Sequence, residues 1–313
     1  MLLVNVIVYI ASFILVWIGS GMIVSAVDKF SRKLRVSSFI VSFIILGLLT
    51  STPEFAVGLR SVAENDPEIF IGNLIGGIPV IFFFVLPVLA ILGNGIKTNG
   101  NLPKYKLLFS LFVFLAPSIL ILDKKVTNSE GFIMIGLYLA LVVFLQFGRG
   151  IFNGDKTKVL NAKAYSYKDL IKILIGIGIV FVTSNFIVEN TIYFSQILNV
   201  PLFFISLIVL SFGTNIPEIS LAVRSALSRK KDVAFGDYMG SAAANTFLFG
   251  ILTILNNGEA LTDTDFTPTF IFIALGLSVF YYFTRSKSSI SRKEGFILLG
   301  IYIIFIAFIF NRQ

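Results

Sequence analysis

The stretch TSTPEFAVGLRS, residues 50–61, places a proline, a carboxylate and an arginine inside an otherwise apolar run. The same pattern returns as TNIPEISLAVRS at residues 214–225. At this offset of 164 residues the match continues without a gap, from residues 36–92 onto residues 200–256, with thirteen identical positions. Apolar identities often arise by chance, but repeated Thr, Pro, Glu, Arg and Gly positions do not. The two stretches therefore indicate an internal repeat, on which the organisation of the whole chain depends.

The composition is that of an integral membrane protein. Hydrophobic residues make up 56% of the chain and charged residues only 13%, whereas a soluble domain carries about 25% charged residues. Apolar runs of the roughly 20 residues needed to cross a bilayer recur along the chain. We expect an all-α integral membrane fold with ten transmembrane helices, near residues 3–27, 37–60, 69–92, 105–122, 131–148, 169–189, 201–225, 233–255, 267–284 and 295–311.

The net charge of +8 is unevenly placed along the chain. Of the 25 Lys and Arg residues, 21 follow the odd-numbered spans, and only Arg60, Lys124, Lys125 and Arg312 fall on the opposite side. Cationic loops stay on the cytoplasmic side of a membrane, so the basic charge is explained without nucleic acid. This distribution predicts a multi-pass protein of the cell membrane with both termini extracellular. The first span lacks a cationic leader and a cleavage site, so we expect it to be a retained helix.

The repeat divides the chain into two halves of five spans. An odd number of crossings inverts the second half relative to the first. We expect a first five-helix repeat at residues 1–149, a cytoplasmic linker at 150–168 and an inverted second five-helix repeat at 169–313. Inverted repeats are typical of secondary transporters, whose substrate site lies near the midplane where the halves meet. The sequence therefore predicts a transporter and not an enzyme.

Two prolines predict breaks in the middle of the membrane. Pro53 and Pro217 lack an N–H, so the carbonyls of Leu49 and Gly213 lose their helical partners. Glu54 and Glu218 follow directly, and a carboxylate is too costly at that depth to face lipid. Carboxylate, hydroxyl and carbonyl oxygens are the ligands that Ca²⁺ and Na⁺ prefer. Because the chain has no Cys and no His, we expect no zinc site and no cofactor apart from transported Ca²⁺ and Na⁺ or H⁺.

Each repeat carries a further polar residue nineteen positions after its glutamate. These residues are Asn73 and Asp237, and a helical hairpin returns them to a similar depth. They either contact an ion directly or hold its ligands by hydrogen bonds. Only Glu54, Glu218 and Asp237 are acids well inside the expected spans, and two carboxylates balance the charge of one divalent cation.

The doubled pattern T-x-x-P-E followed by G-[ND]-x-x-G resembles the two alpha repeats of the cation/calcium exchanger superfamily. The ten-span form is similar to the prokaryotic sodium/calcium exchangers of that superfamily. The resemblance implies antiport of Ca²⁺ against Na⁺ by alternating access, in which spans 1 and 6 slide against the other eight. Its partners are calcium and sodium ions and the lipid bilayer, and it predicts no particular oligomeric state. The ligands it implies are Thr50, Glu54, Thr214, Glu218 and Ser241, with backbone oxygens at Gly47 and Ser211.

The chain departs from the pattern of that superfamily at four positions. Gly77 and Ile81 stand where a serine and an asparagine are expected, Asn245 replaces an acid and Asp237 replaces an asparagine. The second half thus keeps Ser241 and Asn245 as oxygen ligands, while the first half has lost both counterparts. We therefore expect the ion position nearer Thr50 to be weakened. The surviving position is expected nearer Thr214, biased toward the outside.

Three alternatives compete with sodium/calcium exchange. A proton/calcium exchanger would use the same scaffold, with Glu54 or Glu218 carrying the proton. A degenerate scaffold or channel would keep the fold with altered ion stoichiometry. An intramembrane aspartyl protease would use the Gly-Asp pair at residues 236–237, but no second aspartate lies well inside an expected span.

Overall fold

The computed structural model describes residues 2–31, 43–44, 47–97, 103–146, 167–228, 231–256, 259–262, 264–286 and 289–311. The predicted linker at 150–168 lies outside the described residues, except for its last two positions at the start of a helix. Residues 37–42 and 45–46 of the second predicted span also lie outside them.

The predicted spans correspond to helices, as the composition required. Seven coincide with single helices: α1 (Leu2–Ser31), α7 (Lys104–Leu120), α8 (Asn128–Gln146), α9 (Tyr167–Leu198), α13 (Lys231–Leu255), α14 (Thr267–Ser286) and α15 (Arg292–Phe310). The third span is continuous through α5 (Pro67–Pro79), the π-helical η2 (Val80–Val85) and α6 (Leu86–Leu92). In the described residues these eight helices are long and apolar enough to cross a membrane.

The second and seventh spans are broken, as the two prolines predict. The second consists of α3 (Gly47–Thr50) and α4 (Thr52–Glu64). The seventh consists of α10 (Leu202–Ile205), η5 (Ser206–Leu210), α11 (Ser211–Thr214) and α12 (Ile216–Ser228), and it bends by 43° at the break. Both breaks leave one residue between half-helices, Ser51 in one and Asn215 in the other.

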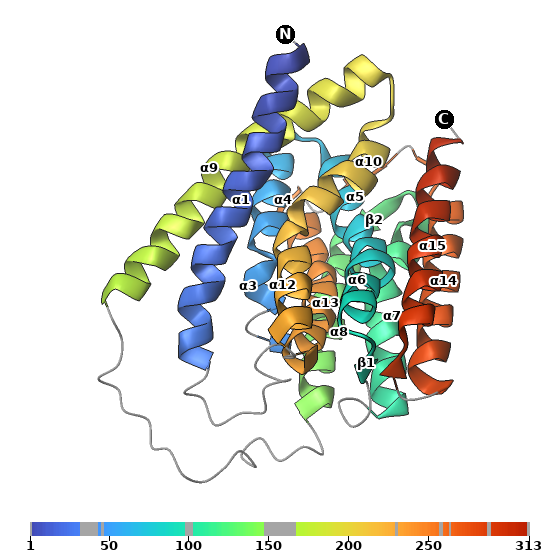
Figure 1. Ribbon diagram of the computed structural model, residues 1–313. Coiled ribbons are helices and arrows are strands. Elements are labelled where there is room, and N and C mark those ends of the chain that lie inside the picture. Colours follow the sequence, from blue (N-terminus) through green and yellow to red (C-terminus); the bar gives the residue numbers. More distant parts are fainter. Residues whose placement is uncertain are drawn as a thin grey trace.

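The two longest helices, α1 and α9, lie together along one side of the bundle (Figure 1). They cross where two glycines meet, because a Cβ on Gly19 would lie 2.9 Å from the Gly176 carbonyl oxygen. A Cβ on Gly176 would likewise lie 2.6 Å from the Gly19 carbonyl oxygen. Farther along, the Tyr9 hydroxyl shares a buried 2.8 Å hydrogen bond with Thr191. α1 and α9 thus form a tightly joined pair resting on the broken helices.

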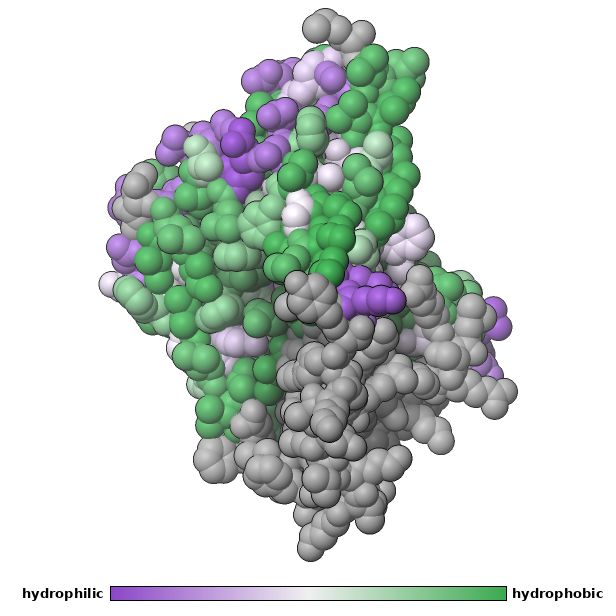
Figure 2. Space-filling model, turned by 90° about the vertical axis from the view of Figure 1, so that its left-hand side faces the viewer, coloured by the Kyte–Doolittle hydropathy of each residue, from purple (hydrophilic) through white to green (hydrophobic). Residues whose placement is uncertain are grey.

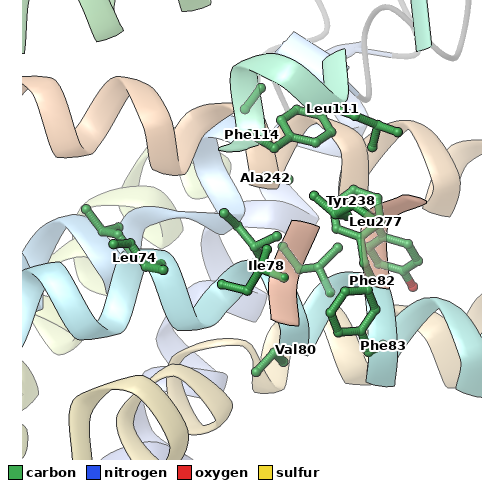
Figure 3. Close-up of a cluster of buried hydrophobic side chains, with 14 of the residues drawn as sticks. Leu74, Ile78, Val80, Phe82, Phe83, Leu111, Phe114, Tyr238, Ala242 and Leu277 are labelled. Atoms are coloured by element: carbon green, nitrogen blue, oxygen red, sulfur yellow. The ribbon is translucent and has the colours of Figure 1, made fainter. Parts of the chain in front are cut away.

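The centre of the bundle is formed by the third and eighth spans. In the most apolar stretches of the α5–α6 span and of α13, 83% and 78% of the residues are buried, against 28% in α1, α8 and α15. Around α5 and η2, side chains from α7, α13 and α14 fill the core (Figure 3). The Phe82 ring packs against the rings of Phe114 and Phe280, with centroid distances of 5.5 Å and 4.9 Å. The outer helices instead expose Leu, Ile and Phe side chains, which give one face of the molecule its broad hydrophobic surface (Figure 2).

The repeat-related glycines bring the two halves into backbone contact. A Cβ on Gly76 of α5 would lie 2.1 Å from the Leu207 carbonyl oxygen in η5. Its counterpart, Gly240 of α13, would place a Cβ 2.0 Å from the Phe43 carbonyl oxygen. The third span of each half therefore packs against the broken second span of the other half, and this exchange decides which residues meet in the site.

Two short antiparallel ribbons join loops that are far apart in sequence. β1 (Ile96–Lys97) pairs with β4 (Ser289–Ile290), in the loops after the third and ninth predicted spans. β2 (Lys125–Thr127), which follows the short 3₁₀ turn η3 (Ile121–Asp123), pairs with β3 (Glu259–Leu261), in the loops after the fourth and eighth. The expected all-α fold contained no strands. Each ribbon joins loops that the charge distribution places on the same side, and the two termini lie at the same end of the molecule (Figure 1).

Candidate cation site

Three carboxylates are buried in the bundle, and they are the three acids expected there. Glu54 is 2% exposed, and Glu218 and Asp237 are 0% exposed. Among the residues whose side-chain burial the structure describes, no other Asp or Glu is buried. Glu54 and Glu218 are close enough to repel each other, and so are Asp237 and Glu218. Among the described residues no lysine or arginine pairs with them.

One oxygen of each buried carboxylate has no hydrogen-bond partner in the described part of the chain. These atoms are Glu54 Oε2, Glu218 Oε2 and Asp237 Oδ2. A buried charge left in this way is strongly unfavourable unless a cation or a proton compensates it. The described residues nevertheless include no three acidic, His or Cys side chains placed to hold one metal ion together. A cation must therefore use one or two carboxylates combined with hydroxyl, amide and carbonyl oxygens.

The first cluster of such oxygens lies at the α3–α4 break, and we call it the Ser241 position. The Gly47 carbonyl accepts hydrogen bonds from Thr50 Oγ1 at 3.1 Å and Ser51 Oγ at 2.9 Å. Ser241 Oγ from α13 lies 3.0 Å from Thr50 Oγ1 and 3.3 Å from Ser51 Oγ. It also donates to Glu218 Oε1 at 2.8 Å. Three hydroxyl side chains thus connect the Gly47 carbonyl at the break in one half to the carboxylate of the other.

The second cluster lies at the α11–α12 break, and we call it the Asn215 position. The Ser211 carbonyl accepts from Thr214 Oγ1 at 3.3 Å and from Asn215 Nδ2 at 2.8 Å. The same Asn215 nitrogen donates to Glu54 Oε1 at 3.3 Å. Gly77 takes the place that Ser241 holds in the first cluster. The two positions are therefore equivalent by the repeat but differ in their chemistry.

Asn73 and Asp237 make repeat-equivalent hydrogen bonds to the threonines of the two clusters. Thr214 Oγ1 donates to Asn73 Oδ1 at 3.0 Å, and Thr50 Oγ1 donates to Asp237 Oδ1 at 3.4 Å. The hairpins thus return both residues to the depth of the breaks, as the nineteen-residue spacing predicts. Both orient a threonine hydroxyl, and Asp237 adds a second carboxylate to the Ser241 position.

The structure corrects the expected placement of the surviving ligands. Ser241 lies with Thr50 and not with Thr214, because α13 packs against α3 of the other half. The position that lacks a serine is therefore the one beside Thr214. The expectation that the position nearer Thr50 is the one with fewer ligands was wrong for this reason.

The Leu49 carbonyl, expected to be free, accepts a 2.7 Å hydrogen bond from Thr52 Oγ1. Asn245 Nδ2 donates to the Leu74 carbonyl at 3.2 Å, which leaves Oδ1 as the atom for its expected ligand role. The Asn245 side chain fills the space beside Gly77, because a Cβ added to Gly77 would lie 2.5 Å from Asn245 Nδ2. Ile81 belongs to the apolar core.

Sequence reasoning missed Ser51 and Asn215, the single residues at the two breaks. Their position between two half-helices was the available signal, because backbone groups at a break need local polar partners. Their difference in residue type adds to the asymmetry between the two clusters that Asp237 and Asn73, and Ser241 and Gly77, already create.

Broken membrane helices that meet at buried carboxylates define a secondary transporter for cations. The model of the family described as sodium/calcium exchanger protein matches residues 4–147 and 169–311, so the chain belongs to this family and is a cation/calcium exchanger by class.

Two relatives and a solved structure extend over nearly the whole chain. An uncharacterized membrane protein of Methanocaldococcus jannaschii is 25% identical over 312 residues, covering 98% of both chains. The sodium/calcium exchanger MaX1 of Methanosarcina acetivorans is 23% identical over 350 residues, covering 99% of both. A structure of the sodium-calcium exchanger NCX_Mj superposes with a TM-score of 0.70 at 21% identity, covering 98% of this chain and 99% of the other.

Proposed function

We propose that the chain exchanges calcium for sodium across the cell membrane by alternating access. The observation that carries this proposal is the pair of breaks, which place Glu54 and Glu218 in the protein interior beside hydroxyl and carbonyl oxygens. The name of the relative MaX1 supports sodium as the coupling ion. The joined α1–α9 pair moves against the remaining bundle and exposes the site to each side in turn.

The chain crosses the membrane ten times as two inverted five-helix repeats. Eight long helices, the bent pair of the seventh span and the α3–α4 pair support this count. The ribbons support it further, because each joins loops that an even number of spans separates. Residues 1–149 and 169–313 are the two repeats, and the linker joins them on the cytoplasmic side.

The proposed ligands are the carboxylates Glu54 and Glu218, with hydroxyls and backbone oxygens at the breaks. Asp237 and Asn73 hold or supplement them, and Asn245 supports the site through its bond to α5. The full proposed set is Glu54, Glu218, Thr50, Thr214, Ser241, Asn245, Gly47, Ser211, Asp237 and Asn73.

A proton/calcium exchanger is the second candidate. The observation in its favour is the three buried carboxylates, each with an unpartnered oxygen, which protonation would satisfy as well as a cation does.

The coupling ion is tested by flux in proteoliposomes that contain the full chain. We expect an outward sodium gradient to drive ⁴⁵Ca²⁺ uptake at least about tenfold above protein-free vesicles, because each sodium that leaves gives up free energy to calcium entry. A pH gradient without sodium should drive none. Uptake driven only by the pH gradient would show that protons, and not sodium, are the coupling ion. No uptake under either gradient would contradict exchange.

Single cysteines test the topology in this Cys-free chain. Ala63→Cys lies in the last turn of α4, after the second predicted span and on the side predicted outside. Lys104→Cys lies at the start of α7, on the side predicted inside, and both positions are exposed. We expect a membrane-impermeant maleimide added to intact cells to label the first and not the second. Equal labelling of both from one side would contradict the ten-span topology.

A further inference from the structure

The two repeat-equivalent clusters differ at the residue that occupies each break, Ser51 in one and Asn215 in the other. Both residues donate to the carbonyl that begins the break, Ser51 Oγ to Gly47 at 2.9 Å and Asn215 Nδ2 to Ser211 at 2.8 Å. Asn215 makes a second bond, to Glu54 Oε1 at 3.3 Å. Its nitrogen therefore bridges a carboxylate and a backbone carbonyl, the two oxygens that a cation at this position would need as ligands.

The chemistry of the bridging group distinguishes the two clusters. A hydroxyl oxygen keeps lone pairs and can turn its hydrogen away to bind a cation, whereas an amide NH₂ has two donors and no acceptor. Because both partners of Asn215 Nδ2 are acceptors, the amide orientation is determined by the hydrogen-bond network. If the amide turned to present Oδ1, the oxygens of Asn215, Glu54 and Ser211 would lie together. Both hydrogen bonds of Nδ2 would then be lost. The amide thus occupies the place of a monovalent cation with its own partial positive charge.

Two neighbouring residues strengthen this difference. Gly77 brings no oxygen to the Asn215 position, whereas Ser241 brings a hydroxyl to the other. The Ser241 position also has Asp237 in addition to Glu218, while the described residues around Asn215 include one carboxylate, Glu54. Charge and ligand number both favour a monovalent cation at the Ser241 position.

We propose that the Asn215 amide permanently replaces a monovalent cation at its position, so that the chain binds a single sodium ion, at the Ser241 position. This inference deepens the proposed function and rests on it. Glu54 remains available to calcium through Oε2, which has no hydrogen-bond partner in the described residues. The consequence is a lower number of monovalent ions per calcium than a chain with two hydroxyl-lined positions would carry.

The test counts bound sodium directly. Purified full-length protein in detergent, without calcium, is equilibrated with ²²Na⁺, and the ions bound per chain at saturation are measured. We expect one sodium for the unaltered chain and two for Asn215→Ser, which copies Ser51 into the second cluster. The double variant Asn215→Ser/Gly77→Ser also restores the second hydroxyl, and the Asn245 amide near Gly77 must shift to admit it.

Asn190→Ser is the matched control. Asn190 is a buried asparagine of α9 whose Nδ2 donates to the Phe186 carbonyl of its own helix at 2.7 Å. We expect its sodium count to equal that of the unaltered chain. Sodium also raises the Tm of the protein through binding, and a second site makes this rise steeper. The Tm series therefore checks folding and provides a second measurement for each variant.

Two results would overturn the inference: two sodium ions on the unaltered chain, or the same count before and after Asn215→Ser in folded protein. Failure of the proposed function would be recognised by a different measurement, the absence of calcium flux in vesicles. The number of sodium ions bound per chain can still be measured on such a protein. Sodium binding without calcium flux would thus refute exchange and leave the role of Asn215 standing.

Discussion

Glu218→Gln and Glu54→Gln are each expected to reduce ⁴⁵Ca²⁺ uptake in proteoliposomes by about 100-fold or more. Each substitution keeps the size of the side chain but removes one negative charge from a buried site in which, among the described residues, no basic side chain forms an ion pair with the carboxylates. Loss of one partner from a buried charge pair costs about 3–5 kcal/mol. In either variant, a divalent cation would be balanced by one carboxylate of the Glu54 and Glu218 pair, whereas in the unaltered chain it is balanced by both.

The two variants should also differ from each other. Glu218 Oε1 accepts from Ser241, a hydroxyl, whereas Glu54 Oε1 accepts from the Asn215 amide. Glu218→Gln should therefore also weaken sodium binding, while Glu54→Gln should affect mainly calcium. Glu68→Gln is the control, because Glu68 is only partly buried and accepts from Thr262 away from the breaks. Uptake at the unaltered rate by either site variant would contradict the paired-carboxylate site.

Gly76→Ala is expected to lower the Tm and to abolish transport. Its Cβ would lie 2.1 Å from the Leu207 carbonyl oxygen and 2.7 Å from Ser211 Oγ, and the first of these is backbone that cannot rotate away. Overpacking of a close interior contact costs about 1–3 kcal/mol. Because η5 leads directly into the α11–α12 break, the displacement also moves Ser211, whose carbonyl lines the Asn215 position.

Gly136→Ala in α8 is the matched control for this substitution. A Cβ at Gly136 would meet nothing within 4 Å, and alanine favours a helix over glycine by up to about 1 kcal/mol. We expect this variant to keep its transport and its Tm, or to raise the Tm slightly. Thermal unfolding in detergent and ⁴⁵Ca²⁺ flux are measured on both variants. If Gly76→Ala is as stable and as active as Gly136→Ala, α5 and η5 do not pack as closely as the structure shows.

Local features of the sequence determined the class of the protein. Apolar runs long enough to cross a bilayer predicted the helices, and the missing N–H of Pro53 and Pro217 predicted where two of them break. Glu54, Glu218 and Asp237 were identified as the buried acids, because a carboxylate in an apolar span is too costly to face lipid. Each of these inferences needs only a residue and its near neighbours along the chain.

Contacts between the halves were decided only by the tertiary structure. The spacing of Gly76 and Gly240 indicates close helix packing but not the partner, and the partner proved to be the broken span of the opposite half. That exchange places Ser241 beside Thr50, brings Asn215 onto Glu54 and leaves Gly77 opposite Asn245. The physical reason is that hydrogen bonds and backbone contacts act across space, and residues 161 to 191 positions apart meet only after both hairpins have packed.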